Sequence, residues 1–129
     1  MIVGLDHVQV AAPAGCEEDA RAFYGGLLGL EEIEKPPVLA ARGGVWFRVG
    51  EQELHVGVAE PFTTATKAHP ALRLDSAAAL DDLANRLERA GVAVARPDPD
   101  EIPETARIFV ADPWGNRLEL LSRTHIVFT

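Results

Sequence analysis

The chain has 129 residues, 47% hydrophobic and 25% charged, which is the size and composition of one compact domain with its own core. Its net charge of −8 excludes the basic surface that binding to nucleic acid phosphates requires. No apolar run reaches the length of a membrane span, nothing at the N-terminus has the pattern of a secretory signal, and the single cysteine, Cys16, excludes an internal disulfide. We therefore expect a cytoplasmic protein without nucleic acid or membrane partners.

The first half of the chain predicts a strand, a helix and three further strands. Residues 4–11 alternate as a strand does, and a break at 13–15 precedes an acidic turn that suits the start of a helix. One apolar face runs along that helix, at Ala20, Phe23, Tyr24 and Leu27. Further strands are predicted near 30–34, 45–49 and 52–58, and Gly50-Glu51 predicts a hairpin turn between the last two.

The second half predicts the same order of elements. A strand over 69–75 leads to a helix that Asp75 or Ser76 can cap, with its apolar face at Leu80, Leu83, Ala84 and Leu87. After a short strand at 92–95 comes a proline-rich loop. The last two strands are predicted at 107–111 and 117–121, joined by a turn sequence, DPWGN. The pattern β-α-β-β-β thus occurs twice, in module one (about 1–60) and module two (about 69–124), with a linker over about 61–68.

Four segments in this order resemble the vicinal oxygen chelate superfamily of glyoxalases, bleomycin resistance proteins and dioxygenases. The most specific is ADPWGNRLEL at 111–120, which looks like the closing hairpin of that family. Residues 5–8, 23–30 and 69–75 look like its first strand, first helix and fifth strand. The resemblance implies an α+β fold in which two βαβββ modules form a cupped mixed sheet. It does not define the reaction, because one fold supports many chemistries.

Two histidines and a glutamate stand out on the predicted strands. His7, His69 and Glu119 each take the face opposite an apolar pair, as a polar cup above an apolar layer requires. Two neutral imidazoles and one carboxylate can bind a divalent metal and leave positions open for substrate. Taken singly, each is more simply interpreted as a hydrogen-bonded or solvated residue.

The resemblance implies that these same three residues are the ligands of a divalent ion such as Zn, Ni, Mn or Fe. It also implies a fourth ligand from the motif Glu53-Leu54-His55, and the sequence does not decide between His55 and Glu53. Glu119 or Glu53 would then be the catalytic base.

Other residues are candidates for the substrate pocket. Arg48 and Arg73 could clamp a carboxylate or phosphonate from neighbouring strands, or simply face solvent. Trp46 and Phe109 are interpreted as pocket walls or core, and Trp114 as a structural residue of the closing hairpin. Cys16 stands near a helix start, which can lower the pKa of a thiol, but no catalytic partner is near it in sequence. His125 is interpreted as a tail residue.

Two functions from different classes follow. The first is a glyoxalase-like, metal-dependent lyase, isomerase or thiol transferase that acts on a small oxygenated or electrophilic metabolite. The second is a metal-independent protein that sequesters a drug or metabolite, as bleomycin resistance members do, and the acidic charge suits a cationic ligand. A degenerate member with a purely structural role is a third reading. The resemblance also implies a homodimer, with the ligands of one metal coming from one chain or from both.

Overall fold

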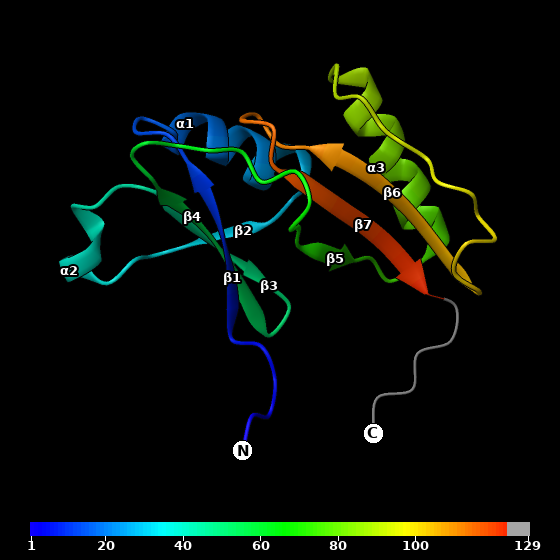
Figure 1. The fold of residues 1–129 in the computed structure, drawn as a ribbon, viewed down its shortest axis with the longest axis horizontal. Coiled ribbons are helices and arrows are strands. Elements are labelled where there is room, and N and C mark those ends of the chain that lie inside the picture. The colour runs from blue at the N-terminus through cyan, green and yellow to red at the C-terminus, as the bar shows by residue number, and fades with distance from the viewer. Residues whose placement is uncertain (124–129) are drawn as a thin grey trace. The chain divides into compact units, whose positions relative to one another are not determined.

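A computed structural model describes residues 1–123 and shows an α+β chain (Figure 1). The chain divides into two compact units. The first contains Met1–Ala65 together with Pro113–Asn116, and the second contains Thr66–Asp112 together with the chain from Arg117 onward. No helix among the described residues is both long enough and apolar enough to cross a membrane.

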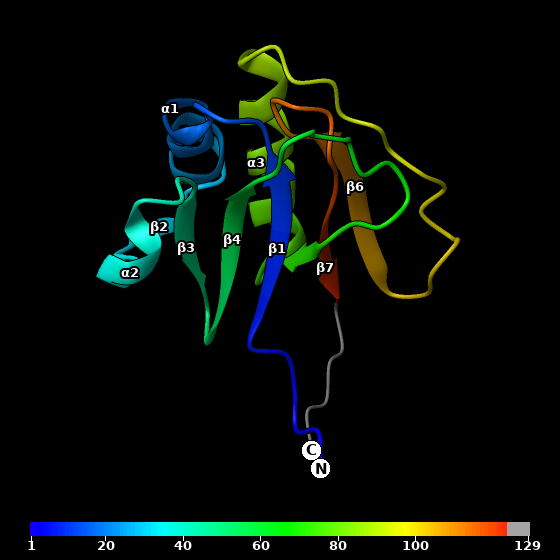
Figure 2. The ribbon, with the colours of Figure 1, turned by 60° about the vertical axis from the view of Figure 1, so that its left-hand side comes forward.

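The first unit is built on a four-stranded sheet in the order β1-β4-β3-β2. β1 (His7–Ala12) pairs parallel with β4 (Gln52–Val58), and β4 pairs antiparallel with β3 (Val45–Val49), as Figure 2 shows. The edge strand β2 (Glu31–Ile33) completes the sheet. The bounds of β3 and β4 agree with the predicted ranges, because alternating side chains and the glycine turn between them define both ends.

A single helix packs on this sheet and changes character along its length. It begins as α1 (Glu17–Ala20) and continues as the π-helix η1 (Arg21–Leu27). A separate one-turn helix, α2 (Pro37–Ala40), follows after β2. Tyr24 is fully buried, with its ring 5.8 Å from that of Phe47 on β3. Leu27 was expected on the same face but is only half-buried, because the wider π turn shifts the later side chains out of the 3.6-residue phase.

The second unit has a three-stranded sheet in the order β5-β7-β6, with one long helix against it (Figure 1). The strands are β5 (Ala71–Arg73), β6 (Thr105–Ala111) and β7 (Arg117–Arg123), and the helix is α3 (Ala77–Arg89). The hydroxyl of Ser76 caps α3 by accepting a hydrogen bond of 3.0 Å from the amide of Ala79. The predicted apolar face of α3 is buried, and it packs against β6 and β7.

Alternation in β6 and β7 separates an apolar face from a polar one. Ile108, Val110, Leu118 and Leu120 are buried on the helix side, where each contributes roughly 1.5–3 kcal/mol of burial free energy. Phe109, Arg117 and Glu119 alternate with them and therefore take the other face. This second face carries the site described below.

Two details differ from the predicted elements. The strand expected at 92–95 is reduced to one bridge, in which Ala95 and Phe109 exchange two hydrogen bonds of 2.9 Å. The prolines that follow, Pro97 and Pro99, lack the amide N–H groups that a longer ladder needs. His69 was expected within a strand, but β5 begins only at Ala71, so His69 lies in the irregular segment before it.

The turn between β6 and β7 belongs to the first unit. The buried side chain of Asn116 donates to the carbonyl of Ala11 at 2.7 Å and accepts from the amide of Ala65 at 3.0 Å. The hydroxyl of Thr64 donates to the carbonyl of Trp114 at 3.1 Å. These bonds give the DPWGN turn a structural role.

Candidate functional site

The strand pairing of the second unit brings Glu119 and His69 together. Glu119 lies on the central strand β7, and its amide donates to the carbonyl of Pro70 at 3.0 Å, which holds His69 beside it. The Oε1 atom of Glu119 is 3.1 Å from Nε2 of His69 and 3.5 Å from Nη1 of Arg107. Only 10% of the Glu119 side chain is exposed, so these neighbours take the place of water around its carboxylate.

The hydrogen bonds of His69 indicate which of its ring nitrogens carries the hydrogen. Nδ1 lies 2.9 Å from the carbonyl oxygen of Lys67, which can only accept, so Nδ1 carries the hydrogen. A neutral ring then directs the lone pair of Nε2 toward the Oε1 atom of Glu119. Two acceptors facing each other need a proton or a cation between them. Histidines that bind metals usually have this arrangement: one ring nitrogen donates a hydrogen bond to a carbonyl or carboxylate, and the lone pair of the other faces the metal.

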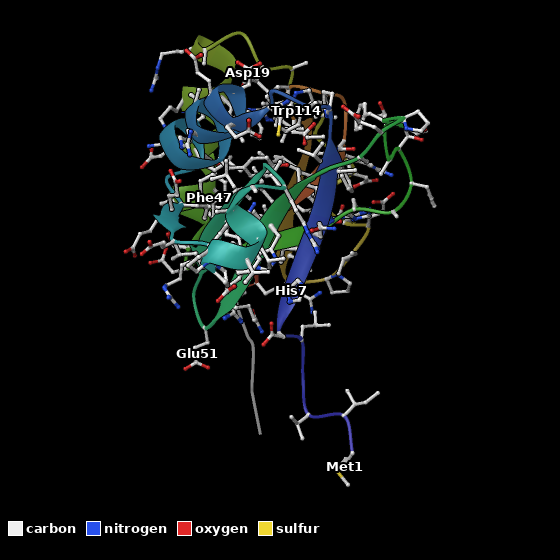
Figure 3. The ribbon with its side chains drawn as sticks, turned by 90° about the vertical axis from the view of Figure 1, so that its left-hand side faces the viewer. Met1, His7, Asp19, Phe47, Glu51 and Trp114 are labelled. Atoms are coloured by element: carbon white, nitrogen blue, oxygen red, sulfur yellow. The ribbon has the colours of Figure 1, made fainter. Side chains whose placement is uncertain are left out.

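His7 has the same arrangement in the first unit. It stands at the start of β1, where the N-terminal segment that begins at Met1 leads away from the sheet (Figure 3). Its Nδ1 is 2.7 Å from the Oδ1 atom of Asp6. A carboxylate at Nδ1 orients the ring and leaves Nε2 as the nitrogen that can bind a metal.

A stack of three rings supports His7 on the sheet of the first unit. His55 on β4 is directly opposite Trp46 on β3, and the two rings are parallel, with centroids 3.8 Å apart. The ring of His7 lies on the other side of His55, at 4.3 Å and 17°. His55 is 5% exposed, and its Nε2 is 2.9 Å from the Oε1 atom of Glu53.

This stack bears on the choice of a fourth ligand. The lone pair of an imidazole nitrogen lies in the plane of the ring, so a metal ion lies close to that plane. The planes of His7 and His55 are nearly parallel and offset, so their lone pairs do not converge on one ion. The geometry therefore favours a positioning role for His55 and leaves Glu53 as the alternative.

The proposed ligands fall in different units, His7 in the first and His69 with Glu119 in the second. Among residues 1–123, no three His, Cys, Asp or Glu side chains are grouped as a complete metal site. The donor set does fit a divalent ion: two imidazoles whose Nδ1 atoms are held by other groups, and one nearly buried carboxylate.

A pocket of about 450 Å³ lies within the second unit, beside His69 and Glu119. Phe109 forms part of its wall, with the guanidinium of Arg117 4.0 Å from the ring centroid. Arg107 also lines it and forms ion pairs with Glu119 and with Glu101.

The arginines of this pocket differ from those the sequence indicated. Arg48 on β3 and Arg73 on β5 are exposed, and neither is among the described residues that line the pocket. Arg107 and Arg117 were missed, although alternation already placed Arg117 on the face of Glu119, and Arg107 on that of Phe109. The sequence alone did not show that this face of β6 and β7 lines a cavity. Trp46 serves the ring stack of the first unit.

The helix start near Cys16 does not lower the pKa of its thiol. The thiol is buried, and burial, followed by its hydrogen bond to Glu17 and the charge of Glu17, raises its pKa to about 11. Glu17 in turn accepts a 2.8 Å bond from the amide of Gly44, and this bond foremost lowers the pKa of its carboxyl group. His125 lies outside the described residues.

Solved structures match both the fold and the length of this chain. A glyoxalase family protein from Bacillus anthracis is 46% identical, with a TM-score of 0.88 over 96% of this chain and 98% of that one. The fosfomycin resistance protein FosX from Listeria monocytogenes (21% identity, TM-score 0.76, 96% of each chain) shares the fold. So does a lactoylglutathione lyase from Agrobacterium tumefaciens (22% identity, TM-score 0.70, 92% of each chain).

None of the curated proteins matches this chain. The family model of the Glyoxalase/Bleomycin resistance protein/Dioxygenase superfamily matches residues 4–120, which is nearly the whole chain. That span covers all of β1 to β6 and most of both units. The chain belongs to the glyoxalase/bleomycin resistance protein/dioxygenase superfamily.

Proposed function

We propose that this protein is a metal-dependent enzyme of the glyoxalase type that acts on a small oxygenated or electrophilic metabolite. His7, His69 and Glu119 would bind one divalent ion, from one chain or from both chains of a cytoplasmic homodimer. The observation that carries the proposal is the contact of 3.1 Å between Nε2 of His69 and Oε1 of Glu119. With Nδ1 of His69 already donating to a carbonyl, the Nε2 atom and the carboxylate have a chemical reason to bind a cation.

The chain's own residues have separable tasks in this proposal. A bound divalent ion would polarise an oxygen of the substrate. Asp6 and the carbonyl of Lys67 hold the two histidine rings in the tautomer that leaves Nε2 free. Glu119 meets His69 and Arg107 through Oε1, so its Oε2 atom is the one that would take a proton from a substrate carbon or hydroxyl.

Metal content tests the proposal directly. Protein purified without chelator should contain close to one divalent ion per chain by elemental analysis. His69→Ala and Glu119→Gln should each lose that ion. Glu51→Gln, at the exposed tip of the β3–β4 hairpin, removes the same charge and should keep it. Stoichiometric metal in both His69→Ala and Glu119→Gln would refute the proposed ligand set.

His55 provides a second, independent discrimination. If His55 only positions His7, then His55→Phe keeps a flat ring between Trp46 and His7 and should retain most of the metal. If His55 is a ligand, the same variant should lose metal as His69→Ala does. Glu53→Gln tests the remaining alternative in the same assay, because this variant should lose metal only if Glu53, which contacts the ring of His55, is itself the fourth ligand.

Metal-free sequestration of a cationic drug is less well supported. The acidic net charge favours a cationic ligand, but the described pocket is lined by more basic than acidic side chains. Metal-free protein that binds a basic drug tightly would favour this second function over the first.

A further inference from the structure

The pocket of the second unit is positively charged within a protein of net charge −8. Four basic side chains line it against two carboxylates: Lys67, Arg96, Arg107 and Arg117 against Glu101 and Glu119. Arg107 pairs with both of these carboxylates, and Arg96 pairs with a third, on Glu88. Among residues 1–123, Lys67 and Arg117 form no ion pair, so two positive charges at this pocket are left without a counter-charge.

Arg117 is held in a way that suits recognition of an anion. Its guanidinium lies 4.0 Å from the centroid of the Phe109 ring, and that of Arg107 lies 5.2 Å from the same centroid. An arginine stacked on an aromatic face keeps its N–H groups in its own plane, where two of them can bind both oxygens of one acid group. The aromatic ring restricts the side chain, so less entropy is lost when the anion binds.

The spacing between Arg117 and Glu119 along β7 indicates the approximate length of the ligand. Arg117 and Glu119 are two residues apart on the same face of a strand, so their Cα atoms are separated by about 7 Å. A molecule with its acid group on Arg117 would therefore extend along this pocket past Phe109 toward Glu119 and His69. This separation corresponds to a metabolite a few bonds long.

We propose that Arg117 and Lys67 form a subsite for the acid group, a carboxylate or phosphonate, of the substrate. The identification of that anion as a substrate rests on the proposed function, whereas the subsite itself consists of residues of the second unit alone. In an acidic protein such a pocket also selects against neutral and cationic analogues, because only an anion gains from the two unpaired charges.

The test measures anion binding without metal. The full-length protein is stripped of metal with a chelator, dialysed, and titrated calorimetrically with methylphosphonate and with acetate. Dimethyl methylphosphonate and acetamide serve as uncharged counterparts. We expect the anions to bind, the uncharged molecules not to bind, and the affinity to fall as salt is added.

Arg117→Met keeps an apolar chain on Phe109 but removes the charge, and should weaken anion binding by about tenfold to a hundredfold. Lys67→Met should weaken it less, since a lysine bonds as a single point charge. Arg42→Met, an exposed arginine of the first unit, makes the same change of charge and should leave binding unaltered. Far-UV circular dichroism establishes that the variants are folded, and Arg117→Lys, with partial binding, provides a milder change.

Equal binding in Arg117→Met and wild type, equal binding of the uncharged molecules, or no binding at millimolar anion would overturn the inference. The two proposals fail separately. Arg117→Met should keep its metal, and His69→Ala should lose metal yet bind the anion in the metal-free assay. A wild-type protein without metal affinity would sink the proposed function while leaving the anion result standing.

Discussion

Replacing Gly44 by alanine should destabilise the first unit for two reasons that can be separated. Gly44 has φ +88, in the left-handed region, and a Cβ atom there would lie 2.2 Å from the carbonyl oxygen of Val56 on β4. An alanine at such a φ costs about 1–2 kcal/mol. Carbon and oxygen approach no closer than about 3.3 Å, so the backbone must move by about 1 Å, and overpacking of this kind costs about 1–3 kcal/mol more.

Gly50→Ala is the matched control. Gly50 also has a positive φ, +61, but a Cβ atom there meets nothing within 4 Å, so only the first cost applies. Urea denaturation should show a loss of about 2–5 kcal/mol in Gly44→Ala and about 1–2 kcal/mol in Gly50→Ala. Because Val56 is opposite Val45 in the β3–β4 ladder, β4 cannot move away without breaking that pairing. Equal losses in the two variants would refute the argument from close approach.

Two further predictions follow from the pKa shifts around Cys16. The thiol of Cys16 has a pKa of about 11, against 9.0 for a free thiol. At pH 8, iodoacetamide should therefore alkylate Cys16 at least about a hundred times more slowly in the folded protein than in urea. Rapid labelling of the folded protein would contradict this. Since the folded state retains the thiol proton, the contribution of Cys16 to stability is present below pH 9 and is lost as the pH rises toward 11, a loss that Cys16→Ala should abolish in denaturation curves. For Glu17 the folded pKa is lowered, so its contribution is present above the ordinary value of 4.5 and is lost as the pH falls through the folded value. Glu17→Gln should therefore cost up to about 1 kcal/mol at pH 7 and almost nothing near pH 3, and should speed the alkylation of Cys16; unchanged stability at pH 7 would argue against the bond to Gly44.

Local sequence patterns predicted the helices and strands whose ends are marked by a turn or capping residue. The hairpin of β3 and β4 is bounded by a glycine turn, and α3 begins at a serine cap and ends before Gly91, which has φ +86. The π-helix η1 lay beyond such rules, because an apolar stripe at 3.6-residue spacing does not reveal where a helix widens. The bridge at Ala95 shows a similar limit, since strand propensity does not count the amides that nearby prolines remove.

The candidate site divides along the same line. Alternation identified the strand faces that carry His7 and Glu119, and the register of β6 with β7 puts Glu119 opposite Phe109. It could not show that the amide of Glu119 bonds Pro70, which places His69 at the carboxylate. It also did not identify Arg107 and Arg117 as pocket residues, because the pairing of distant strands decides which arginines line a cavity.

The side chain of Asn116 has a consequence for how this protein can be divided. The repeated β-α-β-β-β order suggests two pieces that could be made separately, yet the first piece would lack the amide that joins Ala11 to Ala65. The bond to Ala11 connects positions 105 residues apart, so it can form only when nearly all of the chain has been synthesised. Cutting the gene between the modules would thus yield a first unit that lacks the bonds of Asn116, whereas adding the peptide 113–116 back on a linker should restore them.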